Sequence, residues 1–482
     1  MAGLVAGVDC STQSTKVLVV DPDDGRVLGT GRAEHVVTGE RGARETDPRV
    51  WWSALGTALA ATGRAADIRA IAVGGQQHGL VALDRRGEPL RPSMLWNDTR
   101  SGPQARALLD ALGEDFWADR IGLRPVASFT VTKWVWLREN EPEVAKATAA
   151  IRLPHDYVTQ RLTGDGVTDR GDASGTGWWS GTSGAYETAV LEHPIVALEQ
   201  EVLPRVLGPV ETAGQVDDAV AAELGLGNGV VVGPGTGDNA AAALGLGLDA
   251  GQPVVSLGTS GTAYAVSGRQ AHDRTGTVAG FADATGRFLP LAATLNCTLA
   301  VDRVASLLGL DRDDVEPSGE VVFLPYFDGE RTPNLPRASG TLLGLRHETR
   351  PQEVLMAAYE GAALSLLDAI EAIDGQSDGI GPDVPLILIG GGARGATWRE
   401  VFARLSGRPL LIPDAEELVA LGAAVQATAV LRGEDPVAVA RRWATQVGQR
   451  HDPVVRDDAR LATIRAVREA VAAEPALSEG NR

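Results

Sequence analysis

Two similar stretches of sequence, about half the chain apart, constrain the fold most strongly. Residues 4–21 begin with an apolar β-rich run, turn through the small polar residues CSTQST and continue into a second β-rich run. Residues 253–267, PVVSLGTSGTAYAVS, repeat this order of strand, glycine- and hydroxyl-rich turn, and strand. The repeat indicates an ancient duplication in which each hairpin opens one half of the chain.

The segments between the hairpins favour an α/β fold with two domains. A helix-like run at 50–63 precedes the strand-like run IRAIAVGG at 68–75, and helical periodicity returns at 457–473. A chain of 482 residues is too long for one hydrophobic core. The glycine-rich stretch 244–251 precedes the second hairpin and marks the boundary. We expect domains at 1–246 and 247–440, and a helical extension at 441–482 whose last residues, SEGNR, form a frayed tail.

The charge balance argues against polyanionic partners. The chain has 63 acidic and 44 basic residues, a formal net charge of -19, and this negative field repels nucleic acids and anionic membranes. Cys10 and Cys297 lie among apolar or small residues without metal-type spacing, which favours a reducing compartment over a disulfide scaffold or a zinc site. We find no targeting signal and no apolar run of transmembrane length, and we expect a cytoplasmic protein.

The two hairpin turns suit phosphate binding. Each offers backbone N–H groups and hydroxyls with little side-chain bulk, so a phosphate chain can approach the backbone closely. The sequence has no GxxxxGK[ST] motif, and a nucleotide site therefore depends on the double hairpin rather than on a P-loop. Asp9 ends the first strand, where its carboxylate either caps the turn or faces a Mg²⁺–phosphate complex through water.

Asp238 follows a strand and a glycine turn, and with Asn239 it opens an alanine-rich helix within residues 231–244. The commoner role of an Asp at such a position is an N-cap, and the alternative is a carboxylate free to reach a substrate hydroxyl. The stretch GPGTGD before this helix lacks the third glycine of a dinucleotide fingerprint and the acidic residue that should follow, which argues against a dehydrogenase.

Polar clusters follow two predicted strands of the first half. Gln77 and His78 come after residues 68–75, and Trp96, Asn97 and Asp98 come after the short run SMLW. Open α/β sheets bind ligands at strand ends. A lone His is more often structural and a Trp more often core, yet this set suits a polyol, which needs many hydrogen bonds and one apolar face. A third glycine turn at 390–392 follows the apolar run PLILI and serves either packing or close approach of a ligand.

Taken together, these segments resemble the FGGY family of carbohydrate kinases, and most closely its branch that acts on D-xylulose. The similar segments are GVDCSTQSTK (7–16), GGQQHG (74–79), LWNDTR (95–100), LPHDY (153–157), DASGT (172–176), GTGDNAAAALG (235–245), SLGTSGT (256–262), FLPYFDGERTPNLP (323–336) and IGGGARG (389–395). Residues 128–140 and 340–360 resemble the family's two signatures. The resemblance implies two actin-like ATPase (ribonuclease H-like) domains flanking a central cleft, with sugar held mainly by the first domain and ATP by the second.

The resemblance also implies a role for each matching residue. Asp238 would be the general base and a Mg²⁺ ligand, with Asp9 reaching Mg²⁺ through water, while Gln77 and His78 contact the sugar beside Asn239. The first phosphate turn would comprise Thr12, Gln13, Ser14 and Thr15, and the second Gly258, Thr259, Ser260 and Gly261. Gly391, Gly392 and Ala393 would border the adenosine. One position departs from the pattern, because many relatives carry Met where this chain has Gln77.

The reaction implied is transfer of the ATP γ-phosphoryl group to the C5 hydroxyl of D-xylulose, giving xylulose 5-phosphate and ADP in pentose catabolism. L-Ribulose, another pentulose or a glycerol-like polyol are alternative acceptors, since related kinases differ at few sugar-facing positions. A non-kinase actin-like ATPase is a further alternative. The partners expected are thus a sugar and ATP, without nucleic acid or membrane, and a homodimer stays open.

Overall fold

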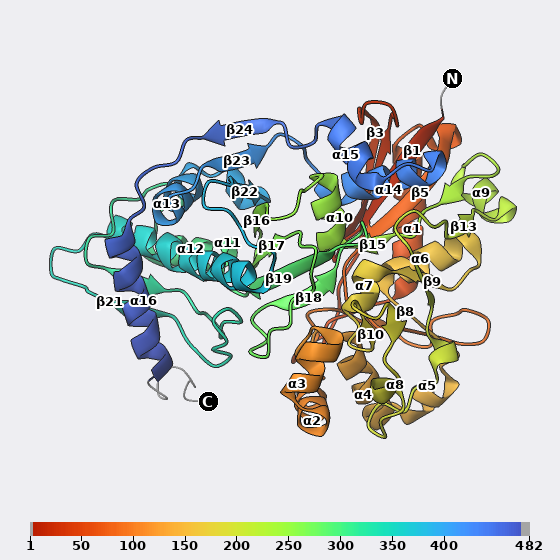
Figure 1. The fold of residues 1–482 in the computed structure, drawn as a ribbon, viewed down its shortest axis with the longest axis horizontal. Helices are drawn as coiled ribbons and strands as arrows, with labels where there is room; N and C mark the ends of the chain where they lie inside the picture. Colours follow the sequence, from red (N-terminus) through yellow and green to blue (C-terminus); the bar gives the residue numbers. More distant parts are fainter. Residues whose placement is uncertain (1–2, 474–482) are drawn as a thin grey trace.

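The computed structural model describes residues 3–473, and within them the chain forms two halves that each contain a seven-stranded sheet (Figure 1). The first sheet has the order β13-β14-β5-β1-β2-β3, and β15 also pairs with β5. Its strands are β1 (Leu4–Cys10), β2 (Ser14–Val20), β3 (Val27–Glu34), β5 (Ile68–Gly75), β13 (Gly214–Gln215), β14 (Val231–Val232) and β15 (Thr236–Gly237). The frayed tail predicted at 478–482 lies outside the described residues.

The second sheet has the order β18-β19-β17-β16-β22-β23-β24. Its strands are β16 (Pro253–Leu257), β17 (Gly261–Ala265), β18 (Ala279–Ala282), β19 (Phe288–Thr294), β22 (Leu386–Ile389), β23 (Leu410–Pro413) and β24 (Gly448–His451). Five small strand pairs complete the described β-structure: β4 (Glu45–Thr46) with β7 (Ser93–Met94), β6 (Val81–Leu83) with β8 (Ala150–Arg152), β9 (Val167–Asp169) with β12 (Arg205–Leu207), β10 (Trp179–Ser180) with β11 (Ala185–Tyr186), and β20 (Val322–Leu324) with β21 (Thr341–Leu343).

The two sheets share one strand pattern. In each, the hairpin (β1–β2 or β16–β17) has an antiparallel neighbour on one side, β3 or β19. On the other side follow two parallel strands, β5 and β14 or β22 and β23, and then an antiparallel edge strand, β13 or β24. This common order agrees with the duplication inferred from the two hairpins in the sequence.

Helices cover both faces of the sheets and fill the junction between the halves. They are α1 (Pro48–Ala61), α2 (Gly102–Leu112), α3 (Glu114–Phe116), α4 (Thr130–Asn140), α5 (Pro142–Ala147), α6 (Pro154–Thr163), α7 (Arg170–Ser174), α8 (Thr188–Leu191), α9 (Asp218–Leu224), α10 (Asp238–Gly245), α11 (Thr298–Leu308), α12 (Pro351–Gln376), α13 (Ala396–Ser406), α14 (Leu418–Arg432), α15 (Pro436–Trp443) and α16 (Asp458–Ala473). Short 3₁₀ turns are η1 (Ala65–Asp67), η3 (Gln200–Val202) and η4 (Gly391–Arg394), and η2 (Trp117–Ile121) is a π-turn. No helix within residues 3–473 is long and apolar enough to cross a membrane.

The alternation of side chains along β1 and β5 gives the first sheet two apolar faces. Ala6 and Val8 pack with α1 and α6, whereas Val5 and Ala70 lie in a core that also contains α10 and α14. That second core is continuous with residues of β16 and β22 in the other half. The halves are thus joined by buried apolar surface, and in Figure 1 α10 stands between their sheets.

Glycines allow β1, α10 and α14 to meet almost backbone to backbone. A Cβ at Gly7 of β1 would lie 1.8 Å from the carbonyl oxygen of Ala420 in α14. A Cβ at Gly422 would lie 1.8 Å from the carbonyl oxygen of Ala241 in α10, and one at Gly245 would lie 2.2 Å from the carbonyl oxygen of Leu418 in α14. We call this three-way contact the glycine joint. It sets how closely α10 and α14, whose first residues line the cavities described below, approach the first sheet.

Both cysteines are buried free thiols. Cys10 ends β1 with 1% of its surface exposed, and Cys297 precedes α11 with none exposed. Burial raises the pKa of each thiol to about 12. At neutral pH both therefore stay protonated and unreactive.

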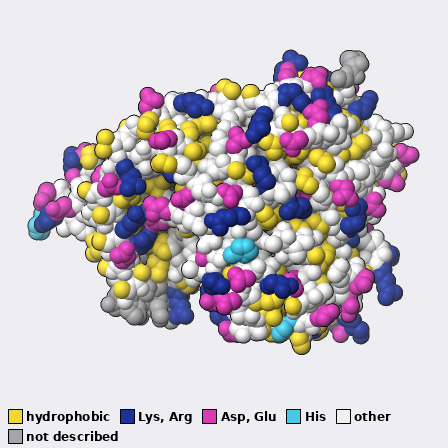
Figure 2. Space-filling model, in the orientation of Figure 1, with side chains coloured by type: hydrophobic (Ala, Val, Ile, Leu, Met, Phe, Trp, Pro, Cys, Tyr) yellow, Lys and Arg dark blue, Asp and Glu magenta, His cyan; other side chains and the backbone are white. Residues whose placement is uncertain are grey.

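The surface mixes charges of both signs. Figure 2 shows acidic and basic side chains interspersed over the face in view, without a gathered basic patch there.

The glycine joint predicts that Gly7→Ala destabilises the protein by about 1–3 kcal/mol, because the added methyl group must push α14 off the sheet. Gly375→Ala in α12 is the matched control, since its Cβ would meet nothing within 4 Å, and alanine favours a helix by up to about 1 kcal/mol. Urea unfolding of the two variants gives the comparison. Equal stability of Gly7→Ala and the parent would contradict a tight joint.

Candidate active site

Two cavities lie between the halves and share one wall. The larger has a volume of about 700 Å³ and is lined by Asp9 and Lys16 from the first half and by residues of η4, β23 and the start of α14 from the second. The smaller, of about 340 Å³, is lined by Gln77, His78 and Trp96 from the first half and by the turn and strands of β17 to β19 from the second. Asp238, Asn239 and Ser256 line both. A group bound in one cavity can therefore meet a group bound in the other at Asp238.

Local backbone geometry puts Asp238 at this shared wall. Strand β15 pairs in parallel with Gly74 and Gly75 at the end of β5, so α10 begins directly at the sheet's edge. Gly237 is the N-cap residue, and a Cβ there would lie 2.6 Å from the side chain of Gln77. The capping role that the sequence left open for Asp238 is thus not the one it has. Its carboxylate lines both cavities.

The hydrogen bonds of Asp238 are made with its neighbour. Its Oδ1 accepts from the backbone N of Asn239 at 2.8 Å and from the side-chain Nδ2 at 2.9 Å. The same Nδ2 donates to Oε1 of Gln77 at 3.1 Å. Gln77, Asn239 and Asp238 therefore form one chain of polar groups that runs from the smaller cavity to the shared wall.

Two carboxyl groups at the larger cavity, those of Asp9 and Asp238, have raised pKa values. Burial, reinforced by the negative charge of Asp9, raises the pKa of Asp238 to about 7. Burial also raises the pKa of Asp9 to about 6, although a hydrogen bond from Ser11 at 2.5 Å and the charge of Lys16 oppose the shift. Paired, desolvated carboxylates of this kind cluster at functional sites and attract cations.

The smaller cavity combines aromatic faces with polar groups. The ring of His78 packs edge-on against Phe129, with centroids 5.1 Å apart, and lies 5.5 Å from Phe281. Burial, with the charges of Lys133 and Arg331, lowers the pKa of His78 to about 3, so the imidazole is neutral at pH 7. His78 also has a positive φ of 66°, an uncommon conformation for this residue type that is typical of functional positions.

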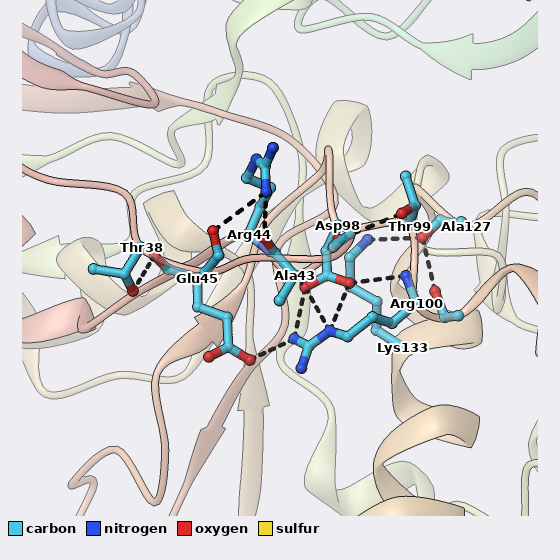
Figure 3. Close-up of polar contacts among 12 residues, drawn as sticks. Thr38, Ala43, Arg44, Glu45, Asp98, Thr99, Arg100, Ala127 and Lys133 are labelled. Atoms are coloured by element: carbon cyan, nitrogen blue, oxygen red, sulfur yellow. Dashed lines mark hydrogen bonds and ion pairs between the residues drawn. The ribbon is translucent and has the colours of Figure 1, made fainter. Parts of the chain in front are cut away.

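Trp96 lines the smaller cavity, but Asn97 and Asp98 do not. Its Nε1 donates to Oγ1 of Thr12 at 3.1 Å. Asp98 is 1% exposed and accepts hydrogen bonds from the backbone N of Arg44 at 2.9 Å and from the guanidinium of Arg100 (Figure 3). Asn97 has a buried Oδ1 without a hydrogen-bond partner in the described chain. Sugar contacts at Asn97 and Asp98 therefore stay a prediction.

Lys133 has a structural place behind the smaller cavity. It is fully buried, and its Nζ donates to the carbonyl oxygens of Ala127 and Ser128 (Figure 3). Burial lowers the pKa of this lysine to about 7. Its hydrogen bonds hold the loop from which Ser128 and Phe129 reach the cavity.

The predicted phosphate turns reach the cavities only in part. In the first turn Gln13 is exposed while Ser14 and Thr15 are buried, and none of these lines either cavity. In the second turn Ser260 lines the smaller cavity, whereas Gly258, Thr259 and Gly261 line neither cavity. Gly391 and Ala393 of η4 line the larger cavity, and Gly392 does not.

Some cavity residues escaped sequence reasoning. Lys16 lines the larger cavity and forms an ion pair of 2.5 Å with Glu417, the residue before α14. Arg124 and Arg331 line the smaller cavity. Lys16 could have been found as one of only three lysines in the chain, next to the first turn. Arg331 lies in the matched segment 323–336, but nothing in its pattern indicates which way the side chain points.

A buried ionic cluster around His155 lies next to the strand that precedes Asp238. His155 Nε2 lies 3.3 Å from Asp156, 3.4 Å from Asp169 and 3.2 Å from Asp172. Burial opposes a charged imidazole, but these carboxylates raise the pKa of His155 well above its usual value. Asp169 also accepts a hydrogen bond of 2.7 Å from Thr236 in β15. The cluster thereby ties α6 and α7 to β15, the strand directly before Asp238.

Comparisons with known proteins agree with this arrangement. The chain is 61% identical over 467 residues to a xylulose kinase of Streptomyces coelicolor, and this alignment covers 96% of this chain and 95% of that protein. It is 33% identical over 422 residues to a xylulose kinase of Escherichia coli, with coverage of 84% and 85%.

Solved structures give the same result for the fold. A xylulose kinase from Bifidobacterium adolescentis matches with a TM-score of 0.83 and 37% identity, covering 97% of this chain and 99% of that one. A glycerol kinase from Plasmodium falciparum matches in fold, with a TM-score of 0.86 at 18% identity and 98% coverage of both chains. The two-domain, actin-like fold expected from the sequence is confirmed.

Profiles of one family account for both halves of the chain. The N-terminal domain of the FGGY family of carbohydrate kinases matches residues 4–245, and its C-terminal domain matches residues 254–431. With the full-length relatives, these matches show that the chain belongs to the FGGY family of carbohydrate kinases.

Proposed function

We propose that this kinase transfers the γ-phosphoryl group of ATP to the C5 hydroxyl of D-xylulose, giving D-xylulose 5-phosphate and ADP, in the cytoplasm as a step of xylose use. The observation that carries the proposal is Asp238 on the wall common to two cavities of the sizes expected for a small sugar and a nucleotide. The identity of 59–61% to relatives named xylulose kinase supports D-xylulose as the acceptor.

The smaller cavity is the proposed sugar site. Gln77 and Asn239 offer amide groups that both donate and accept, and His78 is neutral and can do the same. Trp96 and Phe281 provide apolar faces for the carbon chain. Gln77 is already hydrogen-bonded to Asn239, so a glutamine at this position can serve the site through the same polar chain as Asp238.

The larger cavity is the proposed nucleotide site. Gly391, Gly392 and Ala393 would border the adenosine. The first turn, Thr12 to Thr15, and the second, Gly258 to Gly261, would approach the phosphates. The rigid 3₁₀ turn η4 and the first turn of α14 support this assignment because both line the cavity. On this basis residues 1–246 form the sugar domain, 247–440 the ATP domain and 441–482 an extension.

The donor set at the larger cavity fits Mg²⁺. Asp9 and Asp238 present carboxylate oxygens, the hard ligands that Mg²⁺ prefers. Burial raises the pKa of each, and the charge of Asp9 adds to the shift at Asp238. We propose that Asp238 holds the ion and that Asp9 does so through water. Bound there, Mg²⁺ would neutralise charge on the polyphosphate.

Asp238 is the proposed general base. Phosphoryl transfer has a loose transition state, so orientation of the acceptor hydroxyl matters more than its prior ionisation. The carboxylate would hold the hydroxyl in line and accept its proton as the O–P bond forms. The raised pKa of Asp238 makes it a stronger base than an ordinary carboxylate. The closely packed halves would exclude water, the competing acceptor.

Replacing Asp238 by Ala is expected to lower kcat at least about 100-fold, because base and orientation are lost together. Asp218→Ala is the matched control, since Asp218 is likewise the first residue of a helix, α9, but is exposed and outside both cavities. A coupled ADP assay over a panel of pentuloses and polyols measures turnover and acceptor together. Full activity of Asp238→Ala would refute the base assignment, and ADP release independent of sugar would favour a non-kinase ATPase.

The pH dependence of kcat/KM should follow the ionisation of Asp238. The base acts only when deprotonated, so activity falls as the pH drops below its pKa of about 7. We expect a plateau at alkaline pH and a loss of about tenfold per pH unit on the acid side. Initial rates at low sugar concentration give the profile. A profile that stays level through this region would rule out a base with the raised pKa.

Asp238→Asn should make the protein more stable at about pH 8 while abolishing activity. The pKa of this acid is raised from 3.8 to about 7 in the folded chain, so its ionised form costs stability in full above about pH 7. The cost disappears as the pH falls toward 3.8. Urea unfolding near pH 8 and near pH 4 should therefore show a stability gain at the higher pH only. Asp218→Asn, at an exposed carboxylate, should show no such pattern.

We also propose that the chain forms a homodimer, and a measurement of its mass in solution tests this. Light scattering of the purified chain would show it as a doubled mass.

A further inference from the structure

Arg331 reaches the smaller cavity from the second half, on a loop between β20 and β21. The neighbouring Glu330 fixes this loop, because its buried carboxylate accepts from the backbone N of Leu295 at 2.6 Å, of Asn296 at 3.2 Å and of Arg331 itself at 2.7 Å. The side-chain Nδ2 of Asn296 adds a further bond of 3.0 Å. The backbone of Arg331 is thus held rigidly against the end of β19.

The guanidinium of Arg331 has few partners for a charge in a protein interior. Its Nη2 donates to Oγ of Ser128 in the first half at 3.3 Å, and within residues 3–473 this is its only hydrogen bond. Its charge also helps to lower the pKa of His78, so the two side chains are near each other. Arg331 is partly buried and lines the smaller cavity. A guanidinium has five N–H donors, and those that Ser128 leaves unused are available to the acceptors of a bound ligand.

The other arginine of this cavity is different. Arg124 forms an ion pair of 2.7 Å with Glu114 and donates to the carbonyl oxygen of Arg274 at 3.0 Å. The charge of Arg124 is therefore balanced by Glu114. Arg331 is paired with no carboxylate among the described residues. It is thus the cation of the cavity that is available to a ligand.

The chemistry of the proposed acceptor supplies one oxygen that matches this group. A 2-ketopentose can close a five-membered ring only through its C5 oxygen. The C5 hydroxyl is therefore free to accept a phosphoryl group only in the open-chain sugar, in which C2 is a carbonyl. A carbonyl oxygen only accepts hydrogen bonds and a guanidinium only donates them, whereas Gln77 and Asn239 suit hydroxyls, which do both.

Resting on the proposed function, we propose that Arg331 binds the C2 carbonyl oxygen of the open-chain ketose and makes the site prefer ketoses to polyols. Because Arg331 belongs to the second half and Gln77 and His78 to the first, the sugar is held from both sides of the junction. Sugar binding and approach of the halves are then one event.

The test compares ketose and polyol binding in Arg331→Gln and Arg331→Lys. The probes are D-xylulose as substrate, and xylitol and D-arabinitol, its two reduction products, as competitive inhibitors. For Arg331→Gln we expect the KM for D-xylulose to rise about 10- to 100-fold, the inhibition constants of the polyols to change less than about threefold and the KM for ATP to stay constant. Arg331→Lys, which keeps a donor, should recover part of the loss.

Arg303→Gln is the matched control, because Arg303 is an exposed arginine of α11 that lines neither cavity. It should change the KM for D-xylulose less than about threefold. An equal loss for ketose and polyols, or an effect of Arg303→Gln as large as that of Arg331→Gln, would overturn the inference. Assays of the wild-type protein distinguish failure of the proposed function from failure of the role of Arg331. If this protein leaves D-xylulose untouched but phosphorylates another ketose, the proposed function fails, and the same ratio measured with that ketose and its polyols still decides the role of Arg331.

Discussion

The glycine joint is the constraint on which the rest of the structure depends. Gly7, Gly245 and Gly422 remove side-chain thickness where β1, α10 and α14 cross, so these elements keep fixed relative positions. Both helices begin at the cavities, α10 with Asp238 and α14 directly after Glu417. The separation between Asp238 and the first turn of α14 is therefore set by backbone contact. Such contact is far stiffer than contact through long side chains.

The site gains its chemistry at the expense of stability. Asp9 and Asp238 are carboxylates that resist ionisation, His78 is a histidine that resists protonation, and Arg331 is a cation without a carboxylate partner. Burial thus keeps His78 neutral and makes ionisation of the two carboxyl groups costly. The buried cluster around His155 has a different role, since it gathers three carboxylates around one imidazole and links α6 and α7 to β15.

Local sequence patterns predicted much of the fold, including strand β5, which leads into the candidate site. The run predicted at 68–75 is strand β5, and the helix expected at 50–63 begins earlier, at Pro48, because Asp47 caps it. Asp238 was placed at a helix start from the glycine turn before it. Its freedom from capping could not be predicted, because that depends on Gly237 being the N-cap. That Trp96 lines the smaller cavity while Asn97 and Asp98 do not could not be predicted either, because periodicity cannot show that β7 lies outside the main sheet. The direction of a side chain that crosses from one half to the other is a property of tertiary packing, which is why Arg331 was found only in the structure.

The two thiols have a practical consequence. Cys10 lies in the first half and Cys297 in the second, both buried and both with a pKa of about 12, so thiol reagents will leave the native chain unmodified. A cysteine introduced at an exposed position on each half would then carry a dye or spin label alone, without removal of the natural residues. The distance between two such labels would report how far the halves travel when each ligand binds.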